Sequence, residues 1–543
     1  MTPTWLSLVP PIITLVTALI TKKVARSLLV GIFSATFIMS GYSLKTALLI
    51  STARIWSNTQ ITNLFTWSGA FNNLYTFGFL FFIGILIALI NYTGGIQAYV
   101  QNIQKRLQNT RAVETSSFLL SLCMFLDDYL SCLTVGCVMR PLTDRFNIPR
   151  AKLAFLIDSM AVPLIITIPI SSWVAIITNM LQKSGISDSP YLLPIVLADP
   201  FYLYTRLIPY LFYSIITISA VWFFIRKKIS YGPMKNHEKI AQETGNLFGG
   251  KQPQEITLAG CSGASTSTSI ADFLLPIVTL ILSTVVGLLY TGNYVLLGGA
   301  HNFVQALQHA DSLPVLFWSG MISLIISIIF SLLRSTIDLK TLPAIFWRGI
   351  NLMAYSNMIL LFAWTFSDIL NLLHTGEFLA YLMIGTFPLA FLPCMLYLVS
   401  ALTATMIGSS WATMLMMIPI TVPMVVAYFP INPPVQLTDV AILLPTLGAL
   451  LSGAATGDHI SPIASTTIMA TTSAGAYLID HVKTQLAYAW PSILGSACAF
   501  LVAGITITLN PLLNILCSIA IGLSITLSII WMLNKREKNN SSF

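Results

Sequence analysis

Long apolar segments recur along this chain from Leu6 to Leu533, and they limit its fold more than any other feature. Inside a bilayer the backbone must satisfy its own hydrogen bonds, so an apolar segment of about 20 residues forms a spanning helix. The length of 543 residues leaves room for about 12 to 14 such helices. Charged residues make up 8% of the chain, against roughly a quarter in soluble proteins. We therefore predict an all-α polytopic membrane protein and exclude a soluble enzyme.

The charged residues indicate how the chain is threaded through the membrane. Lys and Arg number 27 against 19 Asp and Glu, a net charge of +8, and they are bunched between the apolar segments. That distribution is typical of membrane topology and not of nucleic-acid binding. Six basic clusters mark predicted cytoplasmic loops: Lys22–Arg26, Lys105–Arg111, Arg140–Lys152, Arg226–Lys251, Arg334–Arg348 and Lys535–Lys538. We expect a cytoplasmic C-terminus, no cleaved signal peptide and a bacterial inner membrane.

One apolar segment does not fit a simple crossing. Residues Ser116–Met139 lie between two basic clusters that both belong in the cytoplasm. A re-entrant hairpin, or a pair of short half-helices, resolves the conflict. Its turn would hold Phe125–Tyr129, which includes Asp127 and Asp128.

The chain divides into two halves that look related. We predict a first membrane repeat over 1–225, a cytoplasmic linker over 226–269, a second repeat over 270–482, further transmembrane helices over 483–534 and a cytoplasmic tail over 535–543. Ser171–Trp173 and Ser409–Trp411 both read Ser-Ser-Trp, and Asp368 lies about as far ahead of the second as Asp127 does of the first. The halves begin on opposite sides, which is the inverted-repeat plan of secondary transporters with broken helices at the midplane.

The first candidate site surrounds Asp127 and Asp128, because a carboxylate inside a membrane is a functional candidate by default. Ser131 and Thr134 lie four and seven residues after Asp127, so a helix would place these oxygens on one face. The alternative is an aspartate pair that caps a helix at the membrane boundary. Asp158 could serve the same cavity, or it could cap a helix or pair with the basic cluster near Arg150. Pro163 and Pro169 predict a broken helix after it.

The second candidate site is the polar segment Ser452–Thr467 within an apolar run. Gly457 and Pro462 bracket Asp458 and His459, which predicts local unwinding there. His459 could relay protons or could be a hydrogen-bonded structural residue. The hydroxyl ligands predicted at the helix breaks of both halves are Ser171, Ser172, Ser409, Ser410, Ser461, Ser465 and Thr466.

At these residues the chain resembles the NhaC family of sodium/proton antiporters, within the wider ion transporter superfamily. The similar stretches are Phe125–Gly136, Val138–Arg145, Pro169–Trp173, Ala363–Trp364, His374–Phe378, Ser410–Trp411, Gly457–Pro462 and Ile479–Val482. The resemblance implies a secondary transporter that exchanges sodium for protons, although relatives carry organic acids or amino acids. Two places depart from the family pattern: Ser465 stands where a carboxylate is usual, and a later motif with an Asp-His pair is altered, as Ala476–Leu478.

Two functions follow from these residues. The first is sodium/proton antiport by alternating access, with sodium at Asp127, Asp128 and Asp458 and no cofactor beyond the coupling ions. The second is an amino-acid or organic-acid transporter on the same scaffold. An intramembrane hydrolase using Ser461, His459 and Asp458 is disfavoured, because the three residues are too close in sequence and no GxSxG motif accompanies them. The expected partners are the lipid bilayer and a small cation, proton or metabolite, with a homodimer left open and nucleic acid excluded.

Overall fold

Helices make up almost all of the fold in the computed structural model. It describes residues 5–21, 23–66, 71–95, 98, 109–188, 194–252, 269–383, 388–429, 431 and 433–540. The helices up to residue 244 are η1 (Trp5–Leu8), α1 (Val9–Thr21), α2 (Val24–Met39), α3 (Leu44–Thr59), α4 (Ile61–Thr66), α5 (Asn72–Thr93), α7 (Thr110–Cys123), α8 (Asp128–Arg145), α9 (Arg150–Met160), α10 (Val162–Ile165), α11 (Ser172–Lys183), α12 (Pro200–Leu207), η3 (Ile208–Tyr210), α13 (Phe212–Lys227) and α14 (Gly232–Thr244).

The second part of the chain continues in the same way. Its helices are α15 (Ala271–Thr291), η4 (Val295–Leu297), α16 (Phe303–Gln308), α17 (Ser312–Leu333), α18 (Leu342–Leu372), α19 (Thr375–Met383), η5 (Leu389–Phe391), α20 (Leu392–Ile407), α21 (Ser410–Ala427), α22 (Leu443–Ile460), α23 (Ser465–Ala474), α24 (Leu478–Ile505) and α25 (Pro511–Asn540). The strands β1 (Ile186–Ser187), β2 (Val196–Leu197) and β3 (Val435–Gln436) form one small parallel sheet.

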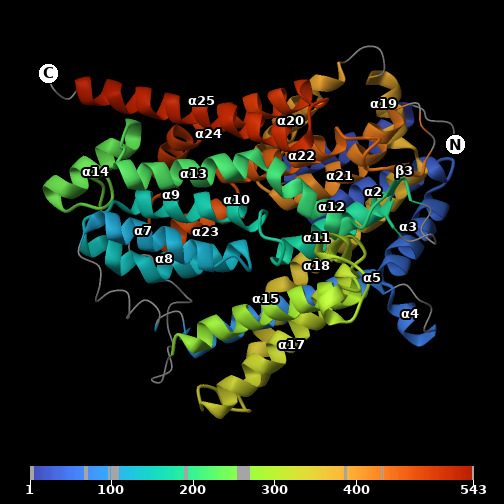
Figure 1. The fold of residues 1–543 in the computed structure, drawn as a ribbon, viewed down its shortest axis with the longest axis horizontal. Coiled ribbons are helices and arrows are strands. Elements are labelled where there is room, and N and C mark those ends of the chain that lie inside the picture. Colours follow the sequence, from blue (N-terminus) through green and yellow to red (C-terminus); the bar gives the residue numbers. More distant parts are fainter. Residues whose placement is uncertain are drawn as a thin grey trace.

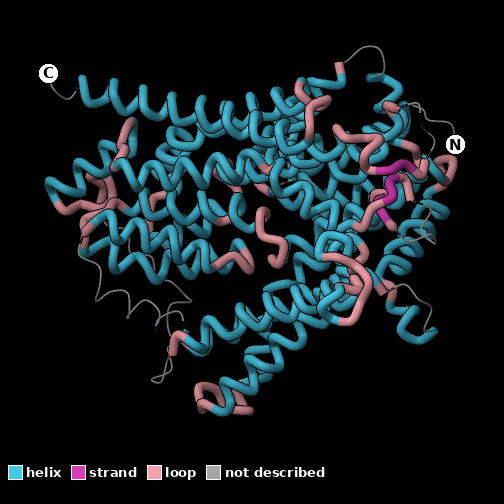
Figure 2. The backbone as a smooth tube through the Cα atoms, viewed as in Figure 1, coloured by secondary structure: helices cyan, strands magenta, loops and turns pink. Residues whose placement is uncertain are grey.

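The long helices run roughly alongside one another (Figure 1). In this view α24 and α25 lie along one edge and α15 and α17 along the opposite edge, with α13, α9, α7 and α8 stacked between them. The short strands join loops at the end of the molecule that also holds the N-terminus (Figure 2). The prediction of an all-α polytopic membrane protein is confirmed.

Fewer helices are long enough to span a membrane than the sequence predicted. Among the described residues eight helices are long and apolar enough, or nine if the bent pair Pro200–Tyr210 and Phe212–Thr244 is one span. The apolar segment that holds α9, α10 and α11 is divided by breaks into pieces shorter than a bilayer crossing. Among the described residues, unbroken helices of spanning length are therefore fewer than apolar length predicted.

The breaks follow an order that recurs in the two halves. Residues 124–127 separate α7 from α8, and residues 166–171 separate α10 from α11. Correspondingly, residues 408–409 separate α20 from α21, and residues 461–464 separate α22 from α23. α9 packs on both α7 and α8, as α22 packs on both α20 and α21. In this order the turn at Asp127 corresponds to the turn at Gly408, whereas the sequence analysis matched the two Ser-Ser-Trp motifs. The inverted orientation of the halves stays a prediction.

Two of the predicted boundaries lie inside helices, and the division into domains stays a prediction. The boundary between 482 and 483 lies inside α24, and the tail predicted from 535 is helical to Asn540 as part of α25. The predicted linker 226–269 contains α14, which packs on α9 and α24. The Gly, Ser and Thr run that suggested a linker, residues 263–268, lies outside the described residues.

Gly457 does not break its helix, contrary to the prediction. α22 continues through it to Ile460, and a Cβ atom at Gly457 would lie 2.3 Å from the carbonyl oxygen of Ala401 in α20. Gly453, one turn earlier, faces the carbonyl oxygen of Tyr397 at 2.4 Å in the same way. The two glycines therefore let the α20 and α22 backbones approach closely, as small residues do in membrane helices. The break comes later, at Ser461 and Pro462, where a proline removes a helix donor.

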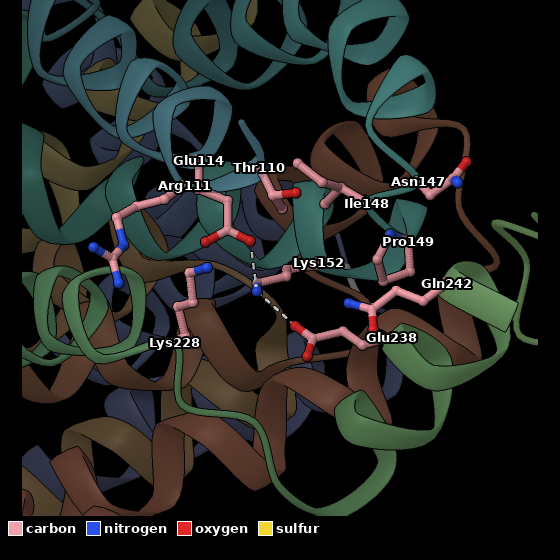
Figure 3. Close-up of a pocket in the computed structure, with 10 residues that line it drawn as sticks. All are labelled: Thr110, Arg111, Glu114, Asn147, Ile148, Pro149, Lys152, Lys228, Glu238 and Gln242. Carbon is pink, nitrogen blue, oxygen red and sulfur yellow. Dashed lines mark ion pairs between the residues drawn. The ribbon is translucent and has the colours of Figure 1, made fainter. Parts of the chain in front are cut away.

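A buried ion cluster holds α14 against the bundle at the end predicted to be cytoplasmic. The ammonium of Lys152 lies 2.6 Å from Glu114 of α7 and 2.5 Å from Glu238 of α14, beside a cavity of about 180 Å³ (Figure 3). Burial by itself lowers the pKa of Lys152, but the two carboxylates outweigh it and raise that pKa above its ordinary value. Lys152 therefore stays charged at neutral pH, and its loss would leave two carboxylates unpaired.

We expect Lys152→Met to destabilise the folded protein by about 3–5 kcal/mol, the usual cost of removing one partner from a buried ion cluster. Lys239→Met is the matched control, because Lys239 pairs with Glu243 at 3.9 Å on the exposed face of α14 and such pairs contribute about 0.3–0.5 kcal/mol. Thermal unfolding in detergent compares the two. Equal midpoints for both variants would contradict the structural role of Lys152.

Candidate functional site

The predicted hairpin turn is present, and it buries both aspartates. α7 ends at Cys123, residues 124–127 are non-helical, and α8 starts at Asp128. The Asp127 and Asp128 side chains are each 1% exposed. Asp128 occupies the first turn of α8, where the helix dipole favours a carboxylate. The pair therefore lies at a helix N-terminus, as the capping alternative required, but deep inside the protein.

The start of α11 closes over this turn. The N–H of Ser172 donates to the carbonyl of Leu126 at 3.0 Å, and its hydroxyl donates to Asp127 at 3.3 Å. The hydroxyl of Ser171 donates instead to the carbonyl of Ile165, six residues earlier, at 3.1 Å. Pro163 lies in the first turn of α10, after a kink at Ala161, and Pro169 lies in the non-helical stretch before α11. The predicted broken helix is confirmed, and it delivers Ser172 to Asp127.

Asp458 is held by two other helix ends. It lies in the last turn of α22 and is 2% exposed. One carboxylate oxygen accepts a hydrogen bond from the N–H of Ser410 at 3.1 Å, and the other accepts from the hydroxyl of Thr466 at 2.6 Å. Ser410 is the first residue of α21 and Thr466 lies in the first turn of α23. Two helix N-termini therefore face one carboxylate, an arrangement that favours negative charge.

The breaks of the two halves meet around these carboxylates. Asp128 lies close enough to Asp127 and to Asp458 for the charges to interact. Tyr129 forms a hydrogen bond with Ser465 at 3.1 Å between their hydroxyls, which joins α8 to α23. Trp173 and Trp411, from the two Ser-Ser-Trp motifs, pack edge to face with 5.4 Å between ring centroids. We call Asp127, Asp128 and Asp458, with their hydrogen-bonding partners, the carboxylate cluster.

Two carboxylates of the cluster, Asp128 and Asp458, lie outside the ion pairs that the described residues form. Within the same residues, one oxygen of Asp128 and the hydroxyl of Ser131 are buried without a hydrogen-bond partner. Thr134 is buried on α8, one turn beyond Ser131. Buried carboxylates at low dielectric require a proton or a cation for neutrality.

The three carboxylates do not converge on one closed metal site. Across the described part of the chain, no group of three His, Cys, Asp or Glu side chains could hold a metal ion. Oxygen ligands for a cation would therefore come from one or two carboxylates together with hydroxyl and carbonyl oxygens, as hard cations accept.

Asp158 and His459 belong to a second cluster. Asp158 is 1% exposed, lies 3.1 Å from the Nε2 atom of His481, and accepts a hydrogen bond from Gln485 at 2.6 Å. His459 bonds to Ser159 at 2.9 Å and to Tyr213 at 2.6 Å through its two ring nitrogens, and Gln485 also donates to its carbonyl. We call these residues the histidine cluster. The structure therefore divides the predicted ionisable residues into two groups.

Two predicted hydroxyl ligands instead stabilise helix ends. Ser409 caps α21 by accepting from the N–H of Ala412, at 3.2 Å, and Ser461 donates to the carbonyl of Thr405 at 2.8 Å. Within the described part of the chain, neither hydroxyl bonds to a carboxylate. Both help to hold the break geometry that presents Ser410 and Thr466 to Asp458.

Sequence reasoning missed His481, Gln485, Ser159 and Tyr213. The available signal was a histidine and a glutamine one turn apart in α24, inside an apolar helix. His481 follows Asp480 directly, and Asp480 points outward to Lys251 at 2.7 Å. Neighbours in sequence on a helix face different directions. Asp480 and His481 therefore belong to different surroundings, although they are adjacent in the chain.

Comparison with known proteins identifies the family of this chain. The model of a Na+/H+ antiporter family matches residues 198–505. An uncharacterized protein of Haemophilus influenzae is 31% identical over 507 residues, which covers 92% of this chain and 91% of that protein. The YdaH transporter of Alcanivorax borkumensis has a similar fold, with a TM-score of 0.51 at 13% identity over 80% of this chain and 85% of that one. The MtrF efflux pump of Neisseria gonorrhoeae gives a TM-score of 0.41 at 14% identity, over 86% and 83%.

We expect Thr466→Val to lower stability by about 1.5–3 kcal/mol, because it removes a buried hydrogen bond to a charged acceptor. Thr472→Val is the matched control, since Thr472 lies on the same helix and its hydroxyl donates to the carbonyl of Ile468, one turn earlier, and not to a carboxylate among the described residues. The unfolding midpoint in detergent measures both. A Thr466→Val midpoint equal to that of the control would show that the hydroxyl does not hold Asp458.

Proposed function

The chain belongs to the Na+/H+ antiporter family, which makes it a multi-pass secondary transporter and not an enzyme, and we propose that it exchanges sodium for protons by alternating access. The proposal also takes the bacterial inner membrane as its location, because a relative that is 31% identical is a protein of Haemophilus influenzae. It places the C-terminus in the cytoplasm, because the basic cluster Lys535–Lys538 follows the last apolar segment.

The observation that carries the proposal is the carboxylate cluster. Asp128 and Asp458 are buried, near enough for their charges to interact, and outside every ion pair between described residues. An uncompensated charge at membrane depth is expensive to move. Protons or a cation can each remove that charge, so the two compete for the same oxygens. Competition of this kind is sufficient to couple the two fluxes in opposite directions.

The neutral groups around the cluster suit a small hard cation. Ser131, Ser172 and Thr466 supply hydroxyl oxygens, and the breaks leave backbone carbonyls outside regular helix bonding. Ser465, which stands where relatives of this type usually have a carboxylate, bonds to Tyr129. A cation with one positive charge needs fewer carboxylates than a divalent ion, which supports sodium over calcium or magnesium.

Alternating access would open the cluster to one side at a time. The breaks at 124–127, 166–171, 408–409 and 461–464 surround the site from both halves. Movement of one half against the other could therefore change access while the ligands stay together, as in transporters built from broken helices.

We expect Asp458→Asn to abolish sodium-driven proton flux in proteoliposomes that contain a pH dye. The amide cannot exchange a proton for a cation, although it can keep the hydrogen bond from Ser410. Asp439→Asn is the matched control, because Asp439 is an exposed loop carboxylate that accepts from the N–H of Gln436. The control should transport like the wild type.

Two results would count against sodium/proton exchange. One is an active Asp458→Asn variant at normal protein content. The other is a folded wild type that gives no signal with sodium, lithium or potassium, after which amino acids and organic acids should be tested as substrates.

A further inference from the structure

We propose that Asp158 and His481 form a second proton-binding site, separate from the carboxylate cluster, that loses a proton when sodium binds at Asp458. This inference rests on the proposed function and assigns part of its proton flux to residues outside the cation ligands. It starts from the histidine cluster, which contains ionisable groups that cation binding does not use.

The geometry of the pair is that of a buried proton acceptor. Asp158 of α9 and His481 of α24 are 1% and 0% exposed, and the carboxylate lies 3.1 Å from Nε2 of the ring. The same oxygen of Asp158 accepts a hydrogen bond from Gln485 at 2.6 Å. The other ring nitrogen, Nδ1 of His481, is buried without a hydrogen-bond partner among the described residues.

These contacts define two protonation states. With one proton on the ring, at Nε2, His481 donates to the Asp158 carboxylate, and the pair has one net negative charge. A second proton at Nδ1 gives an imidazolium beside a carboxylate, with no net charge. The same proton could instead bind to the carboxylate, which again leaves the pair with no net charge. Uptake of one proton therefore neutralises a buried charge.

Other ionisable groups surround the pair from several helices. His459 of α22 interacts electrostatically with both Asp158 and His481, and Tyr213 of α13 and Cys132 of α8 interact with Asp158. Asp458 of α22 also interacts with Asp158. The basic side chains of α9 form ion pairs elsewhere: Arg150 with Asp144, and Lys152 with Glu114 and Glu238. The pair therefore has no fixed cation beside it among these groups.

The pair is positioned to respond to the cation. Asp458 and His459 are adjacent in the last turn of α22, and they belong to different clusters. Gln485 donates both to Asp158 and to the carbonyl of His459, so one amide joins the pair to that turn. A sodium ion at Asp458 adds positive charge near Asp158 and favours release of the proton held by the pair.

The test counts protons released for each sodium ion bound, in purified detergent-solubilised protein at low buffer capacity. The variants are His481→Gln and Asp158→Asn, each compared with His309→Gln, a change of the exposed histidine that follows the last residue of α16. We expect both variants to release fewer protons per sodium ion than the wild type, while the control releases the wild-type number. The pH at which release is half-maximal should also change in the variants only.

The outcomes separate this inference from the proposed function. Wild-type proton counts in a folded His481→Gln variant would overturn the inference and leave the antiport proposal standing. No sodium-dependent proton release in the wild type would overturn both. The glutamine of His481→Gln keeps a neutral hydrogen-bond donor beside Asp158. This variant alone is therefore sufficient for the test if Asp158→Asn does not fold.

Discussion

A helix that ends inside a bundle leaves peptide N–H and C=O groups that only the protein can satisfy, and the site of this protein is built from such ends. The N–H groups at the starts of α11 and α21 bond to the Leu126 carbonyl and to Asp458. Asp128 begins α8. Each break therefore supplies a polar group where a continuous helix would present none, and the carboxylates are stable there because helix N-termini face them.

The last turn of α22 joins the two clusters. Asp458 faces Ser410 and Thr466, whereas His459 faces Ser159 and Tyr213. The close packing of α20 on α22 at Gly453 and Gly457 fixes this turn against a rigid neighbour. A change of charge on one side of the turn would therefore act on the other side over short contacts, and the proposed coupling of cation and proton needs no long pathway.

Much of this arrangement follows from the sequence. Apolar length predicted the membrane helices, the conflict between basic loops predicted the hairpin at Asp127, and Pro163 and Pro169 predicted the break before Ser172. Gly457 was misassigned because glycine also allows close helix contact, and local sequence does not distinguish the two uses. The separation of Asp158 from Asp127 and its pairing with His481 depend on contacts across more than 300 residues. No pattern within one helix could indicate them.

The most direct test of the central claim is equilibrium binding of radioactive sodium to the purified wild-type protein over a range of pH. If protons and sodium compete for the buried carboxylates, the apparent affinity for sodium should fall steadily as the pH falls, while the number of binding sites stays constant. Sodium binding with the same affinity at every pH, in protein shown to be folded, would contradict the account.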